Sequence, residues 1–462
     1  MSGTLSSLNT ALSALRYNRV AMDAASHNIA NVATEGYNRR RVDGESMGAP
    51  TVPARWSRYE GAGGGVRTSA ITRLNDSLLD NRSRTEHSSL SYLDLRATAL
   101  ARMESGIGEP GDSGVAAALA DFRNAWHDLA NDPGGNAARG QVLAGAGSVA
   151  SALAAQSANV DAEMATQRLT LQGTVAEVNA VAKELADTNK AIFTASLDGV
   201  DTSDLADQRD TLSLKLANLT GGVGLLQGDG TMRVAVAGVD LVSGDKAGSL
   251  QVTTGITATG GPDGNPVTLS IDLGGTTTAL SADVRGRVGA SKDLLNTTLP
   301  AYRAGLDAVA KDLADTVNAA HVAGYDQDGN PGKPFFTYDP TAPASSLAVG
   351  VTIREVAASS LAGGAMDGST ADAIATAGTP ESGYQRLVNG FGTEVASATR
   401  LVKTQGLLAT QVDSAREQLS GVNLDEETVA MLTAQRAYEA AARVMSTMDS
   451  VLDTLINRTG VG

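Results

Sequence analysis

Four histidines are the side chains in this sequence best suited to acid–base or metal chemistry, and their spacing favours neither. They are His27, His87, His127 and His321, and no two of them are spaced as a metal-binding pair. Neither H-E-x-x-H nor G-x-S-x-G occurs in the chain. Because a lone histidine on a helix is usually a surface or packing residue, the sequence predicts no catalytic histidine and no metal ligand.

Two glycine-containing runs share some features with ligand-binding loops. Residues 61–65 read GAGGG but lack the Lys-Ser/Thr that follows in a phosphate-binding loop, which favours a flexible turn. Residues 326–330 place oxygen-bearing side chains at the first, third and fifth positions, as in a calcium loop. The twelfth position is Thr337 where a Glu is needed, and Pro331 interrupts the loop. This run therefore predicts an Asx-type turn.

The composition excludes several classes of function. The 462 residues include no Cys, which excludes disulfides, thiolate nucleophiles and zinc–sulfur sites. Asp and Glu outnumber Lys and Arg by 51 to 36, and the net charge of −15 disfavours nucleic acid or an anionic membrane as a partner. Aromatic residues form 3% of the chain, too few to line ordinary small-molecule pockets. We expect no enzyme activity and no cofactor.

Neither a membrane span nor a signal peptide is expected. The chain has no run of about 18 apolar residues, the length that a membrane-spanning helix needs. Its N-terminal stretch lacks the continuous apolar region of a secretory signal peptide. Any export would therefore use another route.

Two apolar seams, one near each end of the chain, are the strongest pattern in the sequence. The N-terminal seam lies on a helix predicted to end near Gly36. Its members are Leu5, Leu8, Leu12, Leu15, Met22 and Ile29. The C-terminal seam keeps a heptad spacing on a helix capped by Asn423 or Asp425. Its members are Leu424, Met431, Ala434, Tyr438, Ala441, Met445, Met448, Leu452 and Leu455. The two helices are predicted to pair as a coiled coil.

Long helices are expected between the seams, because apolar residues recur there at helical spacing. They are predicted at 90–103, 115–129, 139–196, 205–219, 294–317 and 387–419. From 221 to 289, Val, Thr and Ile alternate with turn residues, which predicts a β-rich insertion. Residues 46–75 and 322–385 favour β or irregular structure. The predicted fold class is mainly α with a β-rich insertion, in an elongated, nested, multidomain protein.

This nesting predicts three domains. A terminal coiled-coil domain comprises residues 1–45 and 410–462. A rod domain of long helices comprises residues 46–220 and 290–409. The β-rich outer insertion comprises residues 221–289 and is expected to lie farthest from the chain ends.

The seams have two interpretations, namely packing between two helices of one bundle and an interface between subunits. Both helices are polar outside their seams, so a lone pair of them buries little apolar surface. Each fully buried Leu or Met contributes roughly 1.5–3 kcal/mol, whereas ordering each residue costs on the order of 1–2 kcal/mol. This balance favours a subunit interface, in which neighbouring copies cover the remaining faces.

The segment after the N-terminal seam resembles the signature of bacterial flagellar rod, hook and hook-associated proteins. That signature reads Asn-Ile-Ala-Asn, a variable pair, then Thr-Pro-Gly-Tyr, and Glu35 stands here in place of the Pro. The matching residues are Asn28, Asn31, Thr34, Gly36 and Tyr37. The motif indicates the superfamily of axial flagellar proteins.

Further segments resemble the hook-associated proteins within that superfamily. They are residues 420–427, 435–440 and 453–457, together with 324–336 and its Phe-Phe pair. This resemblance implies a structural subunit at the junction between hook and filament. The terminal helices would form the inner core of a homo-oligomeric ring. Its partners would be the hook protein on one side and the next hook-associated junction protein on the other.

The resemblance also implies a route out of the cell. Such proteins leave through the flagellar type III apparatus and reach an extracellular position on the flagellum, where they serve assembly and motility. A cytosolic export chaperone would hold the C-terminal helix before export. We expect it to bind the stripe formed by Met445, Met448, Leu452 and Leu455, as a groove binds one face of an amphipathic helix.

Two alternatives stay open at this point. Another axial subunit, a hook or distal rod protein, would share both ends but would usually lack a helix as long as that predicted at 139–196. A flagellum-associated peptidoglycan hydrolase would need paired catalytic carboxylates in a cleft-forming domain. The sequence shows no such pair.

Overall fold

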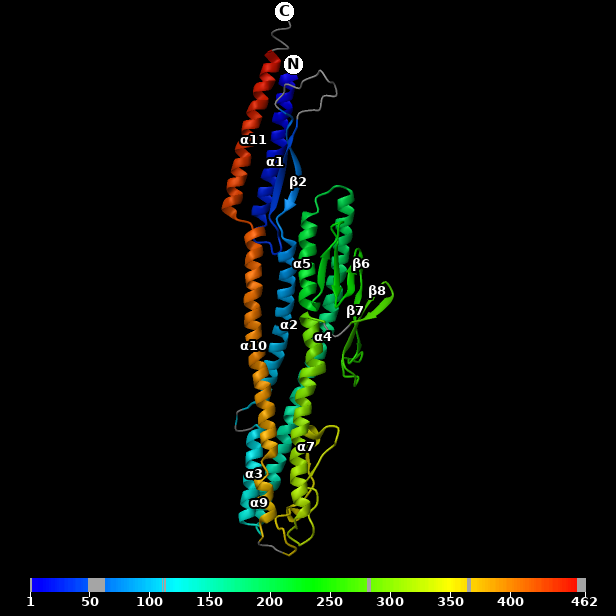
Figure 1. Ribbon diagram of the computed structural model, residues 1–462, viewed down its shortest axis with the longest axis vertical. Coiled ribbons are helices and arrows are strands. Elements are labelled where there is room, and N and C mark those ends of the chain that lie inside the picture. Colours follow the sequence, from blue (N-terminus) through cyan, green and yellow to red (C-terminus); the bar gives the residue numbers. More distant parts are fainter. Residues whose placement is uncertain are drawn as a thin grey trace, which may run out of the picture.

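The computed structural model describes residues 2–48, 63–109, 111, 114–280, 284–363 and 367–454, with side chains from residue 7 onward. Within these ranges the molecule is a long rod built mostly of helices that run along its axis (Figure 1). Small sheets flank the helices on one side. The predicted fold class, mainly α with a β-rich insertion, is confirmed.

Helices account for most of the described chain. They are α1 (Ser2–Ala30), α2 (Ser77–Ile107), α3 (Val115–Asn131), α4 (Asn136–Leu197), α5 (Ser203–Thr220), α6 (Gly286–Asp293), the π-helix η1 (Leu294–Thr298), α7 (Leu299–Ala323), α8 (Pro343–Ser346), the 3-10 helix η2 (Ile353–Glu355), α9 (Ser369–Thr376), α10 (Thr379–Ser420) and α11 (Leu424–Asp453). The 62 residues of α4 give it a length of about 93 Å. Its Ala-rich sequence favours so long a helix, because Ala has the highest helix propensity.

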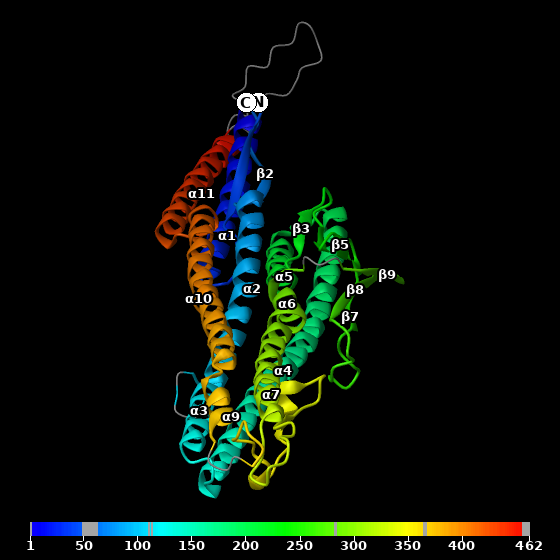
Figure 2. The same cartoon turned by 60° about the horizontal axis from the view of Figure 1, so that its bottom comes forward.

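The strands form small antiparallel sheets. They are β1 (Arg40–Met47), β2 (Gly65–Arg73), β3 (Val223–Leu226), β4 (Met232–Val236), β5 (Val239–Ser243), β6 (Lys246–Ala247), β7 (Ser249–Thr254), β8 (Thr268–Leu273), β9 (Thr276–Ala279), β10 (Phe336–Thr337) and β11 (Ala348–Val349). The sheets have the strand orders β1-β2, β3-β4-β5-β6, β7-β8-β9 and β10-β11. The two larger sheets lie beside α4 (Figures 1 and 2).

The first and last helices, α1 and α11, lie side by side at one end of the rod (Figures 1 and 2). The opposite end is formed by α3, α9 and the loops around β10 and β11. The β-rich insertion flanks the middle of the rod, so the expectation that it lies farthest from the chain ends was wrong. The reason is the length of α4, which runs past the insertion to the far end.

Two apolar cores hold the rod together. The first core joins α2, α3, α7 and α10 toward the far end, and its large members include Leu100, Trp126 and Phe335. The second packs the β3–β8 region against α4 and α5. Among the described residues, neither core includes a side chain before Ala97 or after Ala398. Both cores therefore stop short of α1 and α11.

Several element boundaries differ from the sequence-based prediction. Helix α10 begins at Thr379, with a Pro in its first turn, and α2 begins after the cap residue Asp76, each well before the first apolar repeat. Helix α6 begins at Gly286, within the range expected to be β-rich, because its short polar sequence gives no helical period. Strand β1 was not predicted, since its sequence RRVDGESM lacks alternation. The glycine run at 61–65 lies partly outside the described residues.

Candidate subunit interface and the joint below it

The paired helices α1 and α11, which we call the terminal helix pair, carry the two predicted seams. Most seam side chains are only half-buried in the single chain: Leu8, Leu12, Leu15, Met22, Ile29, Met431, Met445, Met448 and Leu452. The fully buried apolar positions of the pair are Ala11, Ala25, Ala434 and Ala441. The side chain of Leu5 and the whole of Leu455 lie outside the described part of the chain.

Two predicted seam residues are exposed in the structure. Leu424 is 48% exposed and Tyr438 is 36% exposed, whereas Ala437 beside Tyr438 is half-buried. Further apolar side chains of α11 remain open to solvent in the single chain, with Val429 at 63%, Val444 at 46% and Val451 at 40% exposure. The terminal helix pair thus presents more apolar surface than its own two helices cover.

The side of α1 away from α11 is covered by the β1–β2 hairpin. The Tyr17 ring lies against Gly44, where any Cβ would come within 2.9 Å of it. Ser13 Oγ accepts a hydrogen bond from the Val66 amide at 3.2 Å. Because α1 is sandwiched between a hairpin and a helix, the uncovered apolar surface of the pair belongs mainly to α11.

Asn28, the first residue of the family motif, connects three segments below the terminal helix pair. It is 1% exposed, and its amide nitrogen donates to Arg40 O and to Glu427 Oε2, both at 2.9 Å. Its oxygen accepts from the Arg40 amide at 2.9 Å and from Tyr37 Oη at 2.8 Å. Burial raises the pKa of Tyr37 to about 12, so its hydroxyl stays protonated and donates. All four hydrogen-bonding positions of the Asn28 amide are therefore used.

The other motif residues shape the turn that follows α1. Thr34 Oγ1 donates to Asn31 Oδ1 at 3.1 Å, and Asn31 Nδ2 donates to His27 O at 3.0 Å. Helix α1 ends at Ala30, so its predicted end near Gly36 was wrong. Gly36 does adopt the predicted left-handed conformation, with a φ of 79°, and a Cβ there would lie 2.3 Å from Thr211 Oγ1. Only glycine lets the turn approach α5 this closely.

Glu427, at the start of α11, binds the turn that follows α1, a contact that the sequence analysis did not predict. It is 3% exposed and accepts from Arg39 Nε at 2.6 Å as well as from Asn28. The cap of α11 is Asn423, whose Oδ1 accepts from the Asp425 and Glu426 amides. From the sequence, Glu427 was only one of the acidic residues in the first turn of a helix, and this position does not predict which residue it contacts.

A row of five carboxylates at three-residue spacing begins after α4 and continues along α5. We call Asp198, Asp201, Asp204, Asp207 and Asp210 the acidic row. Asn38 Nδ2 donates to Asp207 Oδ1 at 2.6 Å, and Arg73 contacts Asp207 at 2.6 Å and Asp210 at 2.7 Å. Burial raises the pKa of Asp207, although the Arg73 charge opposes this. The spacing was visible in the sequence, but its partners lie far away along the chain.

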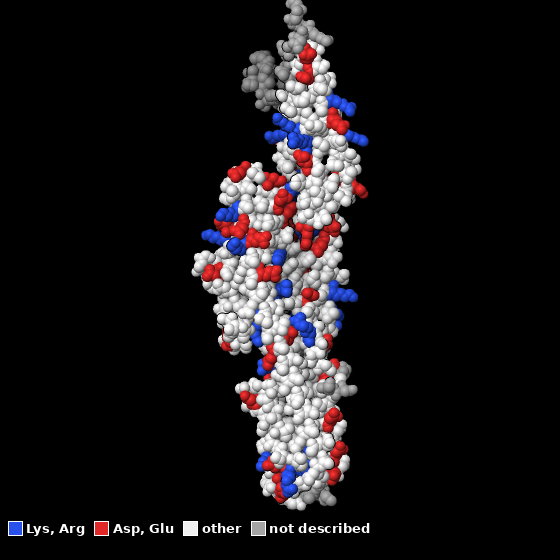
Figure 3. All heavy atoms as spheres, turned by 180° about the vertical axis from the view of Figure 1, so that it is seen from behind, with Lys and Arg blue, Asp and Glu red and all other residues white. Residues whose placement is uncertain are grey.

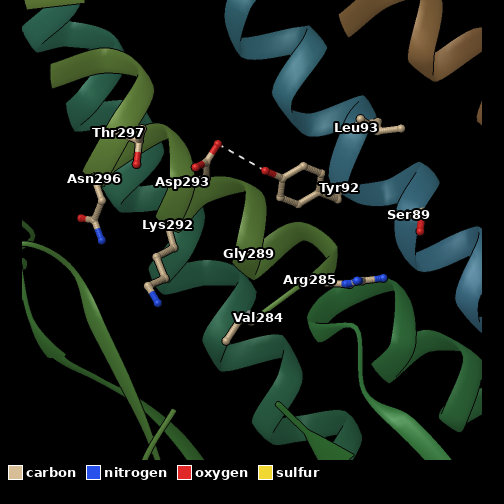
Figure 4. A pocket seen from close by; sticks show the side chains of 10 residues that line it. All are labelled: Ser89, Tyr92, Leu93, Val284, Arg285, Gly289, Lys292, Asp293, Asn296 and Thr297. Atoms are coloured by element: carbon tan, nitrogen blue, oxygen red, sulfur yellow. Dashed lines mark hydrogen bonds between the residues drawn. The ribbon is translucent and has the colours of Figure 1, made fainter. Parts of the chain in front are cut away.

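The structure also contains a groove between α2 and the α6–η1 segment, with a volume of about 700 Å³. Figure 4 shows Tyr92 Oη donating to Asp293, at 3.2 Å, across this groove. Lys292 and Arg285 are its cationic side chains. Asp293, the one carboxylate of the described lining, thus accepts a hydrogen bond from a tyrosine. The described lining therefore places no nucleophilic side chain next to a free general base.

Two of the four histidines are engaged in packing or an ion pair. His321 is 0% exposed, with Nδ1 2.5 Å from Lys333 O and Nε2 accepting from the Ala357 amide at 2.8 Å. His87 contacts Asp413 at 2.8 Å. Within the described ranges, no group of three or more His, Asp or Glu side chains could hold a metal ion. No described helix has an apolar stretch long enough to cross a bilayer.

Comparison with known families bears directly on the middle of the chain. The family model for the FlgK helical domain of flagellar hook-associated proteins matches residues 100–336, more than half of the chain. The chain belongs to the FlgK family of flagellar hook-associated proteins. Residues 8–38 match the flagella basal body rod protein model, and residues 416–458 match the C-terminal model of the basal body rod FlgEFG proteins. The FlgK-type middle confirms the hook-associated reading over the alternative of a hook or rod subunit.

Individual relatives agree with this assignment. Flagellar hook-associated protein 1 of Bacillus subtilis is 28% identical over 507 aligned residues, covering 100% of both chains. The protein of the same name from Escherichia coli is 24% identical, covering 97% of this chain and 99% of its own. The solved hook junction protein FlgK of Burkholderia pseudomallei aligns with a TM-score of 0.50 at 25% identity. That alignment covers 56% of this chain and 47% of the Burkholderia chain.

Proposed function

We propose that this FlgK-family chain is a structural subunit of the bacterial flagellum at the junction between hook and filament, assembled through its terminal helix pair. The family membership and the full-length match to hook-associated protein 1 support a location at this junction. The elongated form with both terminal helices at one end supports the mode of assembly. The proposal assigns no catalytic residue, metal or cofactor.

The main support for the proposal is that the apolar side chains of the terminal helix pair are only partly buried in the single chain. Most of its seam residues are half-buried, and Val429, Val444 and Val451 of α11 are exposed in the single chain. Apolar area removed from water stabilises by roughly 25 cal/mol per Å². Neighbouring copies in a ring would cover this area, with the hook protein on one side and the next hook-associated protein on the other. Exposed apolar surface of this kind marks an interaction site.

Figure 3 supports a protein partner rather than a polyanion. On the face that it shows, Lys and Arg side chains are interspersed with Asp and Glu along the rod, and broad uncharged areas lie between them. A nucleic-acid-binding surface would instead gather its cations into one patch or stripe.

We further propose that the α11 stripe of Met445, Met448 and Leu452 has two successive partners. Before export through the type III apparatus, it would lie in the groove of a cytosolic chaperone. After export to the extracellular junction, the same stripe would pack on the α1 seam of its own chain or of a neighbour. One surface cannot serve both partners at once, so chaperone binding would also prevent premature assembly. Leu455, the fourth residue of the expected stripe, lies outside the described residues.

The test uses Leu452→Asp in the full-length chain, with Asp449→Ser on the exposed side of the same helix as the matched control. A charge at Leu452 enters either interface at a cost of several kcal/mol, since even an uncharged polar group buried without a partner costs roughly 2–7 kcal/mol. We expect the variant to lose both chaperone binding and recruitment to hook ends, observed by electron microscopy. Thermal unfolding of the rod should stay unchanged, and the Asp449 control should behave as the unaltered protein. Unchanged recruitment of the Leu452 variant would contradict the proposed assembly surface.

A further inference from the structure

The contact between the terminal helix pair and the rod is polar. We call it the joint, and define it as residues 36–40, Arg73 and the acidic row. Neither apolar core of the described chain reaches the joint. Besides the covalent connections to α2 and α10, hydrogen bonds and ion pairs hold it, such as Arg39 N donating to Ser420 O at 2.9 Å. Charged contacts hold over a range of orientations, whereas packed apolar surfaces require one fit.

Two cations of the joint, Arg40 and Arg73, each contact two members of the acidic row, whereas Arg39 contacts Glu426 and Glu427 of α11. Arg40 pairs with Asp204 and lies 3.7 Å from Asp201. Arg73 contacts Asp207 at 2.6 Å and Asp210 at 2.7 Å. Members of the row within α5 are three residues apart, which is about 4.5 Å along the helix axis. A small reorientation of the terminal helix pair can therefore break one contact of each arginine and keep the other.

The joint also contains spare acceptors and donors. Asp207 and Arg40 are only 8% and 7% exposed. Nevertheless, the buried atoms Asp207 Oδ2 and Arg40 Nε have no hydrogen-bond partner. Most buried polar atoms in a single well-fitted arrangement are paired. Asp198, the first member of the row, makes no ion pair within the described chain. Asp210 has a second close cation, since Arg209 contacts it at 2.8 Å.

We propose that the joint is a hinge in which the terminal helix pair changes its inclination to the rod as Arg40 and Arg73 exchange partners along the acidic row. The charges retain at least one contact each throughout this exchange, so no guanidinium is left buried and unpaired. This inference rests on the proposed function for its use: subunits between two different polymers would need to present their terminal helices at more than one angle.

The test measures the inclination directly with spin labels. The chain has no Cys, so Ala70→Cys on the exposed edge of β2 and Lys190→Cys on exposed α4 introduce two unique labelling sites in the full-length protein. Pulsed electron resonance then gives the distribution of distances between the labels. Because salt screens the Arg40 pairs, whose Asp201 and Asp204 side chains are 46% and 76% exposed, we expect the distribution to widen by about twofold between 0.05 and 0.5 M NaCl. In Arg73→Gln, it should already be wide at low salt.

The matched control is Asp187→Asn, which removes the exposed Lys183–Asp187 pair of α4 outside the joint. Its label distances should respond to salt as those of the unaltered chain do. A narrow distribution that neither salt nor Arg73→Gln changes would show a rigid brace and overturn the hinge. A wide distribution that is independent of both would overturn it equally, because the ion pairs would then not set the inclination. Neither result touches the proposed function, which recruitment to hook ends tests separately.

Discussion

The two ends of the rod are built in opposite ways. At the far end, Trp126, Phe335 and Phe336 are at most 1% exposed and lie in contact. The ring centroids of Trp126 and Phe335 are 5.4 Å apart, and those of Phe335 and Phe336 are 4.9 Å apart. In the described part of the chain, most aromatic side chains with a fully buried ring thus lie toward this end.

The terminal helix pair buries only small side chains completely. Among the described residues of α1 and α11, the fully buried apolar positions are alanines, while the larger Leu and Met side chains are half-covered. The far end therefore completes its own core, whereas the terminal helix pair leaves apolar side chains half-covered. In the proposed assembly, neighbouring subunits would cover them.

The largest expected effect comes from deleting a ring at the far end. Phe335→Ala should lower the free energy of unfolding by about 3–5 kcal/mol, because it removes a large buried side chain and leaves a cavity. Met445→Ala on half-buried α11 should cost the isolated chain less than about 1 kcal/mol. Urea unfolding followed by circular dichroism measures both values. Equal costs for the two variants would remove the contrast between the ends.

The next largest effect is a pH dependence of stability that should arise at the far end and not in the terminal helix pair. Burial lowers the pKa of His321 to about 4 from the usual 6.5, because desolvation disfavours the charged ring more than the hydrogen bond to Lys333 O favours it. The Ala357 amide donates to Nε2, which can accept only when it carries no proton. The unfolded chain binds this proton below pH 6.5, and the folded chain binds it only below about pH 4. Stability is therefore complete above pH 6.5 and falls as the pH drops toward 4, by about 3 kcal/mol in total.

Unfolding measured between pH 7 and 4 checks this expectation. His321→Gln should flatten the pH dependence, whereas His127→Gln, whose side chain is 44% exposed, should leave it unchanged. Amide exchange should locate the loss of protection at the far end, near residues 321, 333 and 357. If the protection were lost first in α1 and α11, another group would be responsible for the pH dependence.

The sequence predicted the parts of this molecule that follow a local period. Helix α4 was expected at 139–196 and is observed as Asn136–Leu197, and the left-handed Gly36 is observed at a φ of 79°. The pairing of the first and last helices followed from their heptad seams and the nested order. The helix, the turn and each seam repeat between residues close together in the sequence, and only the nested order related the two distant seams.

The joint could not be predicted in the same way. Asn28 and Glu427 are in contact although nearly the whole chain separates them, and Asn38 finds Asp207 on α5. Polar partners leave no periodic signal, so the motif was recognised without its contacts. The position of the β-rich insertion was missed for a related reason, since the order of elements does not show how far a 62-residue helix carries the chain past it.

The smallest expected effect concerns calcium at the far end, where the run 326–330 carries the acceptors of a partial calcium loop. Asp326 Oδ1 accepts from the Asp328 amide at 2.9 Å and from the Asn330 amide at 2.8 Å, which confirms the predicted Asx-type turn. Asp328 is paired with Arg354, so its carboxylate is already engaged. Because these oxygens are used within the protein, the stability of the far end should come from apolar packing. We expect neither added calcium nor a chelator to change the melting temperature. A calcium-dependent rise that Asp326→Asn abolishes would show that a metal ion, in addition to the aromatic core, distinguishes this end from the terminal helix pair.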